Sequence, residues 1–149
     1  MAKFIGVKMI EAVPMTAREA NDKGHRIGNH SFEEDGYEVT YPDGYKSWSP
    51  AEEFEKAYYK LEDPTGDTLK ENDIKRFIKG IENVKVGTKT TNTTLTCLTG
   101  FEVHGQAACV KPENFDLNVG SNYARIKAED KIWGGLGFVL QWAKYGLKK

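Results

Sequence analysis

The feature that most constrains this chain is a polar junction before its middle. Residues 61–67 read Leu-Glu-Asp-Pro-Thr-Gly-Asp and offer almost nothing to bury, which is typical of a connection between modules. We therefore expect a first module at residues 1–62, a linker at 63–68 and a second module at 69–149. Modules this short have small cores, so their few large apolar side chains are expected to pack inside.

The charge of the chain changes sign across this junction. Residues 1–66 carry 8 Lys and Arg against 13 Asp and Glu, a balance of −5, and residues 67–149 carry 13 against 9, a balance of +4. The total of −1 argues against a generic attraction for nucleic acid. No segment approaches the roughly 20 apolar residues of a membrane span. We therefore expect a cytoplasmic protein with no membrane partner.

The first module is predicted to contain a hairpin that runs into a helix. Residues 37–41 alternate as a half-buried strand, residues 42–44 read Pro-Asp-Gly, and residues 45–48 return as the partner strand. Ser49 then stands where an N-cap is expected, with Pro50 in the first turn of the helix.

A second, shorter helix is predicted upstream of the hairpin. Thr16 and Glu19 have the spacing of a capping box, and the helix should end near Lys23. The following loop, residues 24–36, holds two histidines among acidic side chains, but their spacing fits no familiar set of metal ligands. We predict no metal site there.

The aromatic side chains of the hairpin have two interpretations. Tyr37, Tyr41, Tyr45 and Trp48 are expected to supply much of a small module's core. The same rings are also suited to stack on a nucleobase. We keep Tyr45 and Trp48 as candidate ligand contacts.

The second module is predicted to begin with one amphipathic helix. Thr68 and Glu71 have the spacing of another capping box, and Gly80 should break the helix. Its apolar residues recur at helical spacing: Ile74, Phe77, Ile78 and Ile81.

A hairpin and two further helices are predicted next. Strands are expected at 94–99 and 101–110. A helix should start near Pro112 and end at the glycine pair 134–135, and another should occupy about 136–145. The sequence as a whole predicts an α+β fold made of two small modules.

Basic side chains gather on these last two helices and indicate an anionic partner, although a solvated helix face explains much of the same pattern. Asn114 and Phe115 place an amide and a ring beside the free backbone amides of a helix N-terminus, which suits a base and a phosphate. The candidate contacts in this module are Asn114, Phe115, Arg125 and Lys131.

Catalytic chemistry has little support in the sequence. The three histidines, His25, His30 and His104, are accompanied by no motif that would position a nucleophile or base. His104 is expected on the polar face of a strand. Cys97 and Cys109 are expected to be reduced packing residues. We therefore predict no catalytic residue, no metal and no cofactor.

A motif in the second module resembles a widespread family of small tailed-phage proteins. Its strongest parts are Ala107 to Asp116, which reads Ala-Ala-Cys-Val-Lys-Pro-Glu-Asn-Phe-Asp, and Lys131-Ile132-Trp133; Gly120, Ala124 and Ala128 also match. The likeness covers about residues 70–142. It departs at Gly120-Ser121-Asn122, where the family usually has Gly-Arg-Lys, so a basic group is missing at the helix start.

This resemblance implies a small antiparallel sheet followed by two helices. That architecture is similar to the first kind of Thoeris anti-defence protein, an oligomeric sponge that sequesters cyclic nucleotide signals without cleaving them. The first module resembles another phage segment, through Asp43-Gly44-Tyr45-Lys46-Ser47-Trp48-Ser49-Pro50. It is also loosely similar to the second kind of Thoeris anti-defence protein.

Three hypotheses for function follow. The first is a phage-encoded, homo-oligomeric sponge for a cyclic nucleotide or ADP-ribose-derived messenger of Thoeris or CBASS immunity, acting in the cytoplasm of the infected bacterium. The second is an accessory factor that binds a host or phage protein through its acidic first module, where Glu33, Glu34 and Asp35 are consecutive. The third is a small hydrolase that uses one of the histidines.

Overall fold

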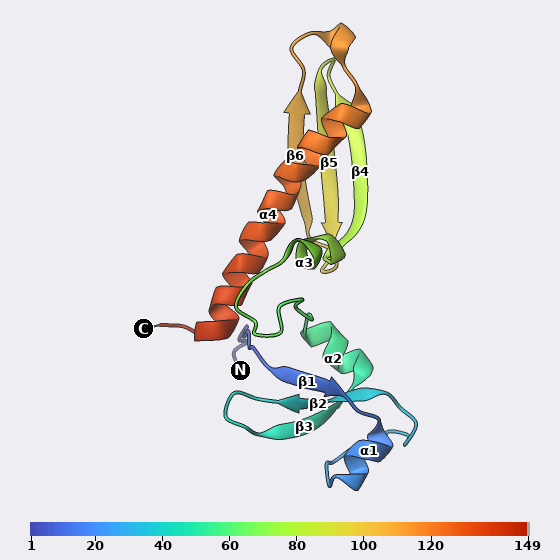
Figure 1. The fold of residues 1–149 in the computed structure, drawn as a ribbon, viewed down its shortest axis with the longest axis vertical. Helices are drawn as coiled ribbons and strands as arrows, with labels where there is room; N and C mark the ends of the chain where they lie inside the picture. The colour runs from blue at the N-terminus through green and yellow to red at the C-terminus, as the bar shows by residue number, and fades with distance from the viewer. Residues whose placement is uncertain (149) are drawn as a thin grey trace. The chain divides into compact units, whose positions relative to one another are not determined.

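The computed structural model describes residues 1–148, and the chain divides into two compact units. The first unit comprises residues 1–60 and the residues from Trp142 onward, and the second comprises residues 61–141. The second unit thus begins at Leu61 and includes the polar junction. Each unit combines one three-stranded antiparallel sheet with helices (Figure 1), so the predicted α+β class is confirmed.

The first unit is built around the predicted hairpin. The strands lie in the order β1-β2-β3, and Ser47 is the register partner of Val39. Trp48 packs with Ala17 and Ala20 in the small core. The elements are β1 (Glu11–Pro14), α1 (Ala17–Asp22), β2 (Gly36–Thr40), β3 (Lys46–Pro50) and α2 (Ala51–Ala57).

The two helix starts predicted in this unit have different outcomes. The cap of α1 is confirmed, because the Glu19 amide donates to Thr16 Oγ1 at 3.2 Å. The predicted cap of α2 is wrong. Ser49 belongs to β3 and its hydroxyl donates to the carbonyl of Pro50 at 3.3 Å, so Pro50 itself takes the cap position without a side-chain cap.

The second unit packs a long helix on one face of its sheet (Figure 1). The sheet order is β4-β5-β6. Its core comprises Ile74, Leu95, Cys97, Val103, Ala128 and Ile132. The elements are α3 (Glu71–Arg76), β4 (Ile78–Val86), β5 (Thr90–Cys97), β6 (Glu102–Ala108), a single 3-10 turn η1 (Pro112–Asn114) and α4 (Leu117–Tyr145).

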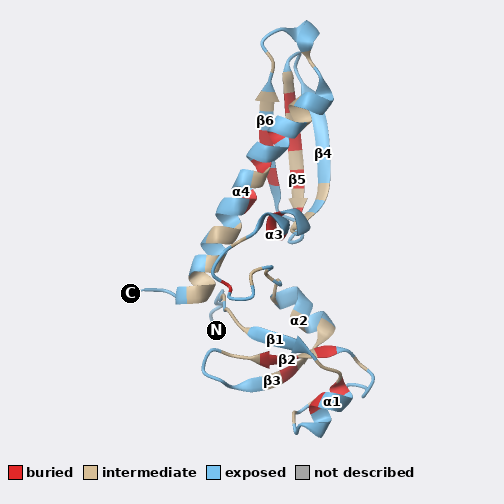
Figure 2. Cartoon of the chain, viewed as in Figure 1, coloured by how far each residue is buried: buried red, intermediate tan, exposed pale blue. Residues whose placement is uncertain are grey.

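Alternation along β5 and β6 determines which face α4 covers. On β6, Val103 and Gly105 are buried, whereas His104 on the opposite face is exposed, as predicted. A Cβ at Gly105 would overlap the backbone of Ala124 and Ala128, so the absent side chain is what allows α4 to lie directly against this strand. Figure 2 shows the buried residues of α4 on its sheet side and exposed residues on its outer side.

The first predicted helix of this unit is wrong beyond Arg76. α3 is short, and Ile78 and Ile81 lie in β4, where Ile81 pairs with Leu95 of β5. Pairing with the sheet overrides the local helical spacing. The capping box is also different: Thr68 donates its amide and its hydroxyl to Asp63 Oδ2, and Asp73 accepts the Lys70 amide at 2.8 Å instead.

The predicted break at residues 134–135 is wrong as well. α4 continues for 29 residues through both glycines, and neither has a positive φ. Each glycine costs about 1 kcal/mol of helix propensity relative to alanine. Packing of Ile132 and Leu136 against the core offsets this cost. Within residues 1–148, no helix has the combined length and apolarity needed to cross a membrane.

Candidate ligand-binding site

An open groove of about 400 Å³ lies in the second unit, where α3, β4 and α4 meet. This volume falls within the range of small-molecule sites, roughly 300–1,000 Å³. Three cations line it against one carboxylate, so the lining is positive. The lining residues are Lys75, Ile78, Lys79, Gly80, Ile81, Arg125 and Glu129.

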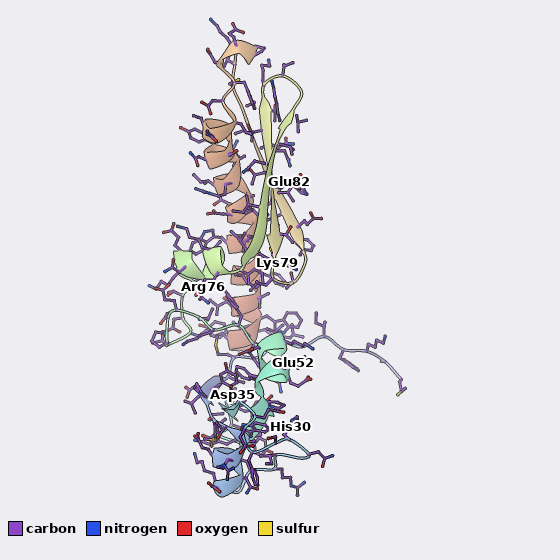
Figure 3. The ribbon with its side chains drawn as sticks, turned by 90° about the vertical axis from the view of Figure 1, so that its right-hand side faces the viewer. His30, Asp35, Glu52, Arg76, Lys79 and Glu82 are labelled. Atoms are coloured by element: carbon purple, nitrogen blue, oxygen red, sulfur yellow. The ribbon has the colours of Figure 1, made fainter. Side chains whose placement is uncertain are left out.

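The join between α3 and β4 brings two of these cations together. Lys75 lies in the last turn of α3 and Lys79 near the start of β4. The register with β5 shifts between Ile78 and Gly80, and such an irregularity redirects the side chains at a strand end. Figure 3 shows Lys79 at the beginning of β4, next to the end of α3 marked by Arg76.

The groove cations are engaged to different degrees. Lys75 Nζ lies 3.0 Å from Glu71 Oε1, and Arg125 Nε lies 3.3 Å from Glu129 Oε1. Both pairs are exposed on the cation side, so each contributes little to stability. The side chain of Lys79 has no hydrogen-bond or ion-pair partner within residues 1–148. The groove therefore presents at least one uncompensated positive charge.

The apolar part of the groove comes from β4. Ile81 lies on the sheet face that α4 covers, yet 53% of its surface is exposed. The reason is the close contact of α4 with Gly105 of β6, which holds the helix over the other side of the sheet. Ile78, half-buried beside the core, continues this apolar surface. Together they can pack against a flat apolar ring.

Of the four contacts predicted in this unit, only Arg125 lines the groove. Lys131 lies six residues further along α4, about 9 Å at the rise of an α-helix. Asn114 and Phe115 precede the helix at the other end of the sheet. The four residues are thus spread from the segment before α4 to the middle of that helix and do not converge on one site.

The helix end beside Phe115 is already occupied by groups of the chain itself. Asp116 Oδ1 accepts the amides of Asn118 at 2.9 Å and Val119 at 3.2 Å. Lys85 Nζ lies 4.6 Å from the centre of the Phe115 ring, in cation–π distance. A ligand there would have to displace a carboxylate from the amides.

The sequence reasoning missed Lys75 and Lys79 for a structural reason. The predicted continuous helix places these two residues one turn apart on a solvated surface. The chain instead turns into a strand at Ile78, which adds β4 to the sheet beside α4. The signal in the sequence that could have indicated the groove is the pair Lys75 and Lys79 on either side of Ile78, where β4 begins.

The two aromatic candidates of the first unit have opposite environments. Trp48 is only 8% exposed, its ring N–H donates to the carbonyl of Met15 at 2.8 Å, and His30 meets it edge-on. Tyr45 is 65% exposed and stacks on Tyr41 with ring centres 5.9 Å apart. Trp48 is therefore a core residue, and of the two only Tyr45 offers an open ring.

The histidines have partners that explain them structurally. His25 Nε2 lies 2.7 Å from Glu38 Oε2, and His30 pairs with Glu34 four residues further along the same loop. Glu38 is buried, and its hydrogen bonds with His25 and Lys23 lower its pKa from 4.5 to about 2. His104 Nδ1 lies 2.9 Å from the hydroxyl of Thr94 on the exposed face of the sheet.

A second groove, of about 510 Å³, lies in the first unit between α1, β2 and α2. Three carboxylates line it, from Glu19, Asp35 and Glu55, beside the ring of Tyr37. The Tyr37 hydroxyl donates to Glu55 Oε1 at 2.9 Å, which raises the tyrosine pKa. This groove suits a cationic group, in contrast to the groove of the second unit.

The outer side of α4 carries an exposed apolar stripe. Val119, Tyr123, Ile126 and Trp133 follow one another at intervals of four, three and seven residues and are all exposed. This spacing places them on one side of the helix, opposite the buried Ala124, Ala128 and Ile132. We call these four residues the α4 stripe.

Comparison with known proteins identifies a family for the second unit. A family model described as the phage protein (N4 Gp49/phage Sf6 gene 66) family matches residues 68–143. No curated protein and no solved structure matches the chain. The matched range includes every residue that lines the positive groove.

Proposed function

Because this chain belongs to the phage protein (N4 Gp49/phage Sf6 gene 66) family, we propose that it acts in the cytoplasm of an infected bacterium as a nucleotide-binding anti-defence protein. Its ligand is an anionic messenger of the cyclic nucleotide or ADP-ribose-derived class. It holds the ligand without turning it over, so the immune effector is starved of its signal. The observation that carries the proposal is the positive groove with an apolar side.

The groove supplies the two kinds of contact that a nucleotide needs. Lys79 and Arg125 approach from different elements and are suited to phosphate oxygens. Ile78 and Ile81 are suited to the face of a base. Glu129 holds Arg125 by its Nε and leaves the terminal guanidinium nitrogens for a ligand. Capture of this kind requires no catalytic residue.

The direct test is to recover the ligand. The purified protein is incubated with cyclic di- and trinucleotides and cyclic ADP-ribose isomers, freed of unbound ligand and denatured by heat, and the released compounds are identified by mass spectrometry. We expect one intact compound at close to stoichiometric amounts. Release of an altered compound would instead support the hydrolase hypothesis. If none of the tested nucleotides is recovered from the protein, nucleotide capture is contradicted.

Variants locate the site. The double substitution Lys79→Ala/Arg125→Ala should weaken binding roughly 100- to 10,000-fold, because charge-assisted hydrogen bonds are worth about 1.5–3 kcal/mol each and two are removed. Lys131→Ala, a matched control on the same helix, should bind normally. Phe115→Ala tests the helix N-terminus: folded protein that loses binding would move the site there and away from the groove.

The acidic groove of the first unit favours a second function, binding of a basic protein partner. Glu19, Asp35 and Glu55 have no ion-pair partner within residues 1–148, so they remain available for Lys or Arg of another protein. Reversal of Glu33, Glu34 and Asp35 should slow such association by weakening electrostatic steering. The same variant should leave nucleotide binding unchanged.

We propose that the sponge is a homo-oligomer joined through the α4 stripe. In an antiparallel pair of α4 helices centred between residues 128 and 129, Lys127 of one copy would lie near Asp130 of the other, and neither residue has an ion-pair partner within residues 1–148. Tyr123→Asp should remove the association through the α4 stripe and so lower the mass measured by sedimentation equilibrium. Phe138→Asp, an equally exposed apolar position on a different side of α4, is the control and should leave the mass unchanged.

A further inference from the structure

The segment before β1 is extended and has no backbone partner. Residues 1–10 form no helix or strand and make no backbone hydrogen bond within residues 1–148. Phe4 is 94% exposed and Ile5 is 81% exposed. In Figure 3 the first part of this segment extends away from the rest of its unit as an arm. We call residues 3–10 the N-terminal arm.

The arm continues directly into an open sheet edge. β1 pairs only with β2, so its other side presents unpaired N–H and C=O groups. An extended segment that leads into such an edge can lengthen it and pair along it. Val7, Met9 and Ile10 are half-buried, which leaves Phe4 and Ile5 as the apolar residues of the arm without cover.

The sequence of the arm is complementary to itself in one antiparallel register. Pairing about Val7 sets Lys3 opposite Glu11 of a second copy and Ile5 opposite Met9, on the same face as Val7. On the other face it sets Phe4 opposite Ile10. The side chains of Lys3 and Glu11 have no partner within residues 1–148, so both are available for this pair.

We propose that two copies of the chain pair through their N-terminal arms, antiparallel about Val7. The first-unit sheets of the two copies are then linked through the paired arms that lead into β1, and Phe4 and Ile5 are covered by the second copy. The interface is isologous, because each arm gives and receives the same contacts. It is separate from the α4 stripe and from both grooves.

The register makes a specific cross-linking test possible. Facing residues of antiparallel strands have Cα atoms about 4.5–5.5 Å apart, within the range that a disulfide spans. Val7→Cys in the full chain, with Cys109→Ser to remove the half-buried native thiol, should therefore form a disulfide-linked dimer under mild oxidation. The readout is local to residue 7, so it does not depend on any association through α4.

Controls in the same arm decide the outcome. Lys3→Cys should not link to itself, because the two copies of residue 3 would be about 26 Å apart at the rise of a strand. A mixture of Lys3→Cys and Glu11→Cys chains should link to each other. Absence of the Val7→Cys dimer, or equal yields from Val7→Cys and Lys3→Cys alone, would overturn the proposal.

A charge swap separates pairing from chance encounter. Lys3→Glu or Glu11→Lys alone should lower the yield of the Val7→Cys dimer about 2- to 10-fold, because each puts like charges opposite one another twice in the dimer. The double variant Lys3→Glu/Glu11→Lys should restore the yield. A double variant no better than the single ones would also contradict the register.

Discussion

The two units stabilise small cores by different means. In the second unit, aliphatic residues of α3, the sheet and α4 pack together, and the helix approaches the sheet where Gly105 has no side chain. In the first unit the buried cluster is limited to Ala17, Ala20 and Trp48, and a buried carboxylate, Glu38, is held by basic side chains. The stability of the second unit therefore depends mainly on close packing, and that of the first depends in part on its ion pairs.

This difference determines which perturbation each unit should feel. A close-packed interface responds to added volume, because neighbouring backbone cannot move aside cheaply. A buried ion cluster responds to pH, because its contribution depends on the protonation state of its members. Variants that act on only one of these properties should therefore affect only one unit.

The largest effect is expected from Gly105→Val. Its side chain would overlap the backbone of Ala124 and Ala128, so α4 must move off the sheet and the second unit should lose about 3 kcal/mol of unfolding free energy. Urea unfolding followed by the helical signal at 222 nm measures this loss, because α4 is by far the longest helix.

A control restricts the effect of Gly105→Val to its own unit. In a background with Trp133→Phe and Trp142→Phe, Trp48 is the only tryptophan and reports on the first unit. The urea midpoint of the Trp48 fluorescence transition should be the same with and without Gly105→Val. A shift as large as that of the helical signal would mean that the two units unfold together.

Acid should act on the first unit through Glu38. The carboxylate lies near Lys23 and His25, at 3.0 and 2.7 Å, and near Lys46 at 3.8 Å, and its pKa is lowered from 4.5 to about 2. A group with a lowered pKa stabilises the fold above its unfolded value and loses that effect as pH falls to its folded value. The Trp48 transition should therefore weaken between about pH 4.5 and 2.

Glu38→Gln tests this assignment. The variant should be less stable near neutral pH, because the basic neighbours lose their counter-charge, and its stability should vary less between pH 4.5 and 2. The second unit also has an acid-sensitive carboxylate, Asp63, whose pKa is held low by Thr65 and Thr68. Asp63 orders only a loop, so the helical signal should change little over this range. An unchanged acid dependence in Glu38→Gln would contradict the role of Glu38.

The sequence predicted best where a local signal and the packing agree. The hairpin of the first unit follows from alternation around a Pro-Asp-Gly turn, and Trp48 faces the core as that pattern requires. The hairpin formed by β5 and β6 is also confirmed. In each case one face of the strand is buried, so the register is fixed by the same residues that define the pattern.

The failures occur where a distant contact decides. Ile78 and Ile81 have helical spacing, but pairing with β5 draws them into a strand. Gly134 and Gly135 end a helix by local propensity, but the core contacts of Ile132 and Leu136 continue it. The groove exists because Ile78 and Ile81 lie in a strand, and this strand brings Lys79 to the groove that Arg125 also lines. The predicted helix could not indicate that position for Lys79, whereas Arg125 lies on a helix that was predicted.

The smallest effect is expected from Gly134→Ala. A Cβ at this position meets no atom within 4 Å, and alanine favours a helix over glycine by about 1 kcal/mol. The unfolding free energy of the second unit should therefore rise by that amount, and its helical transition should move to a higher urea concentration, in the direction opposite to Gly105→Val.

Gly134 immediately follows Trp133 of the α4 stripe, so the measurement also probes the outer side of α4. If the gain is present at low protein concentration and absent at high concentration, a second copy occupies that side of the helix. A loss of stability at every concentration would mean that the middle of α4 is not helical in solution.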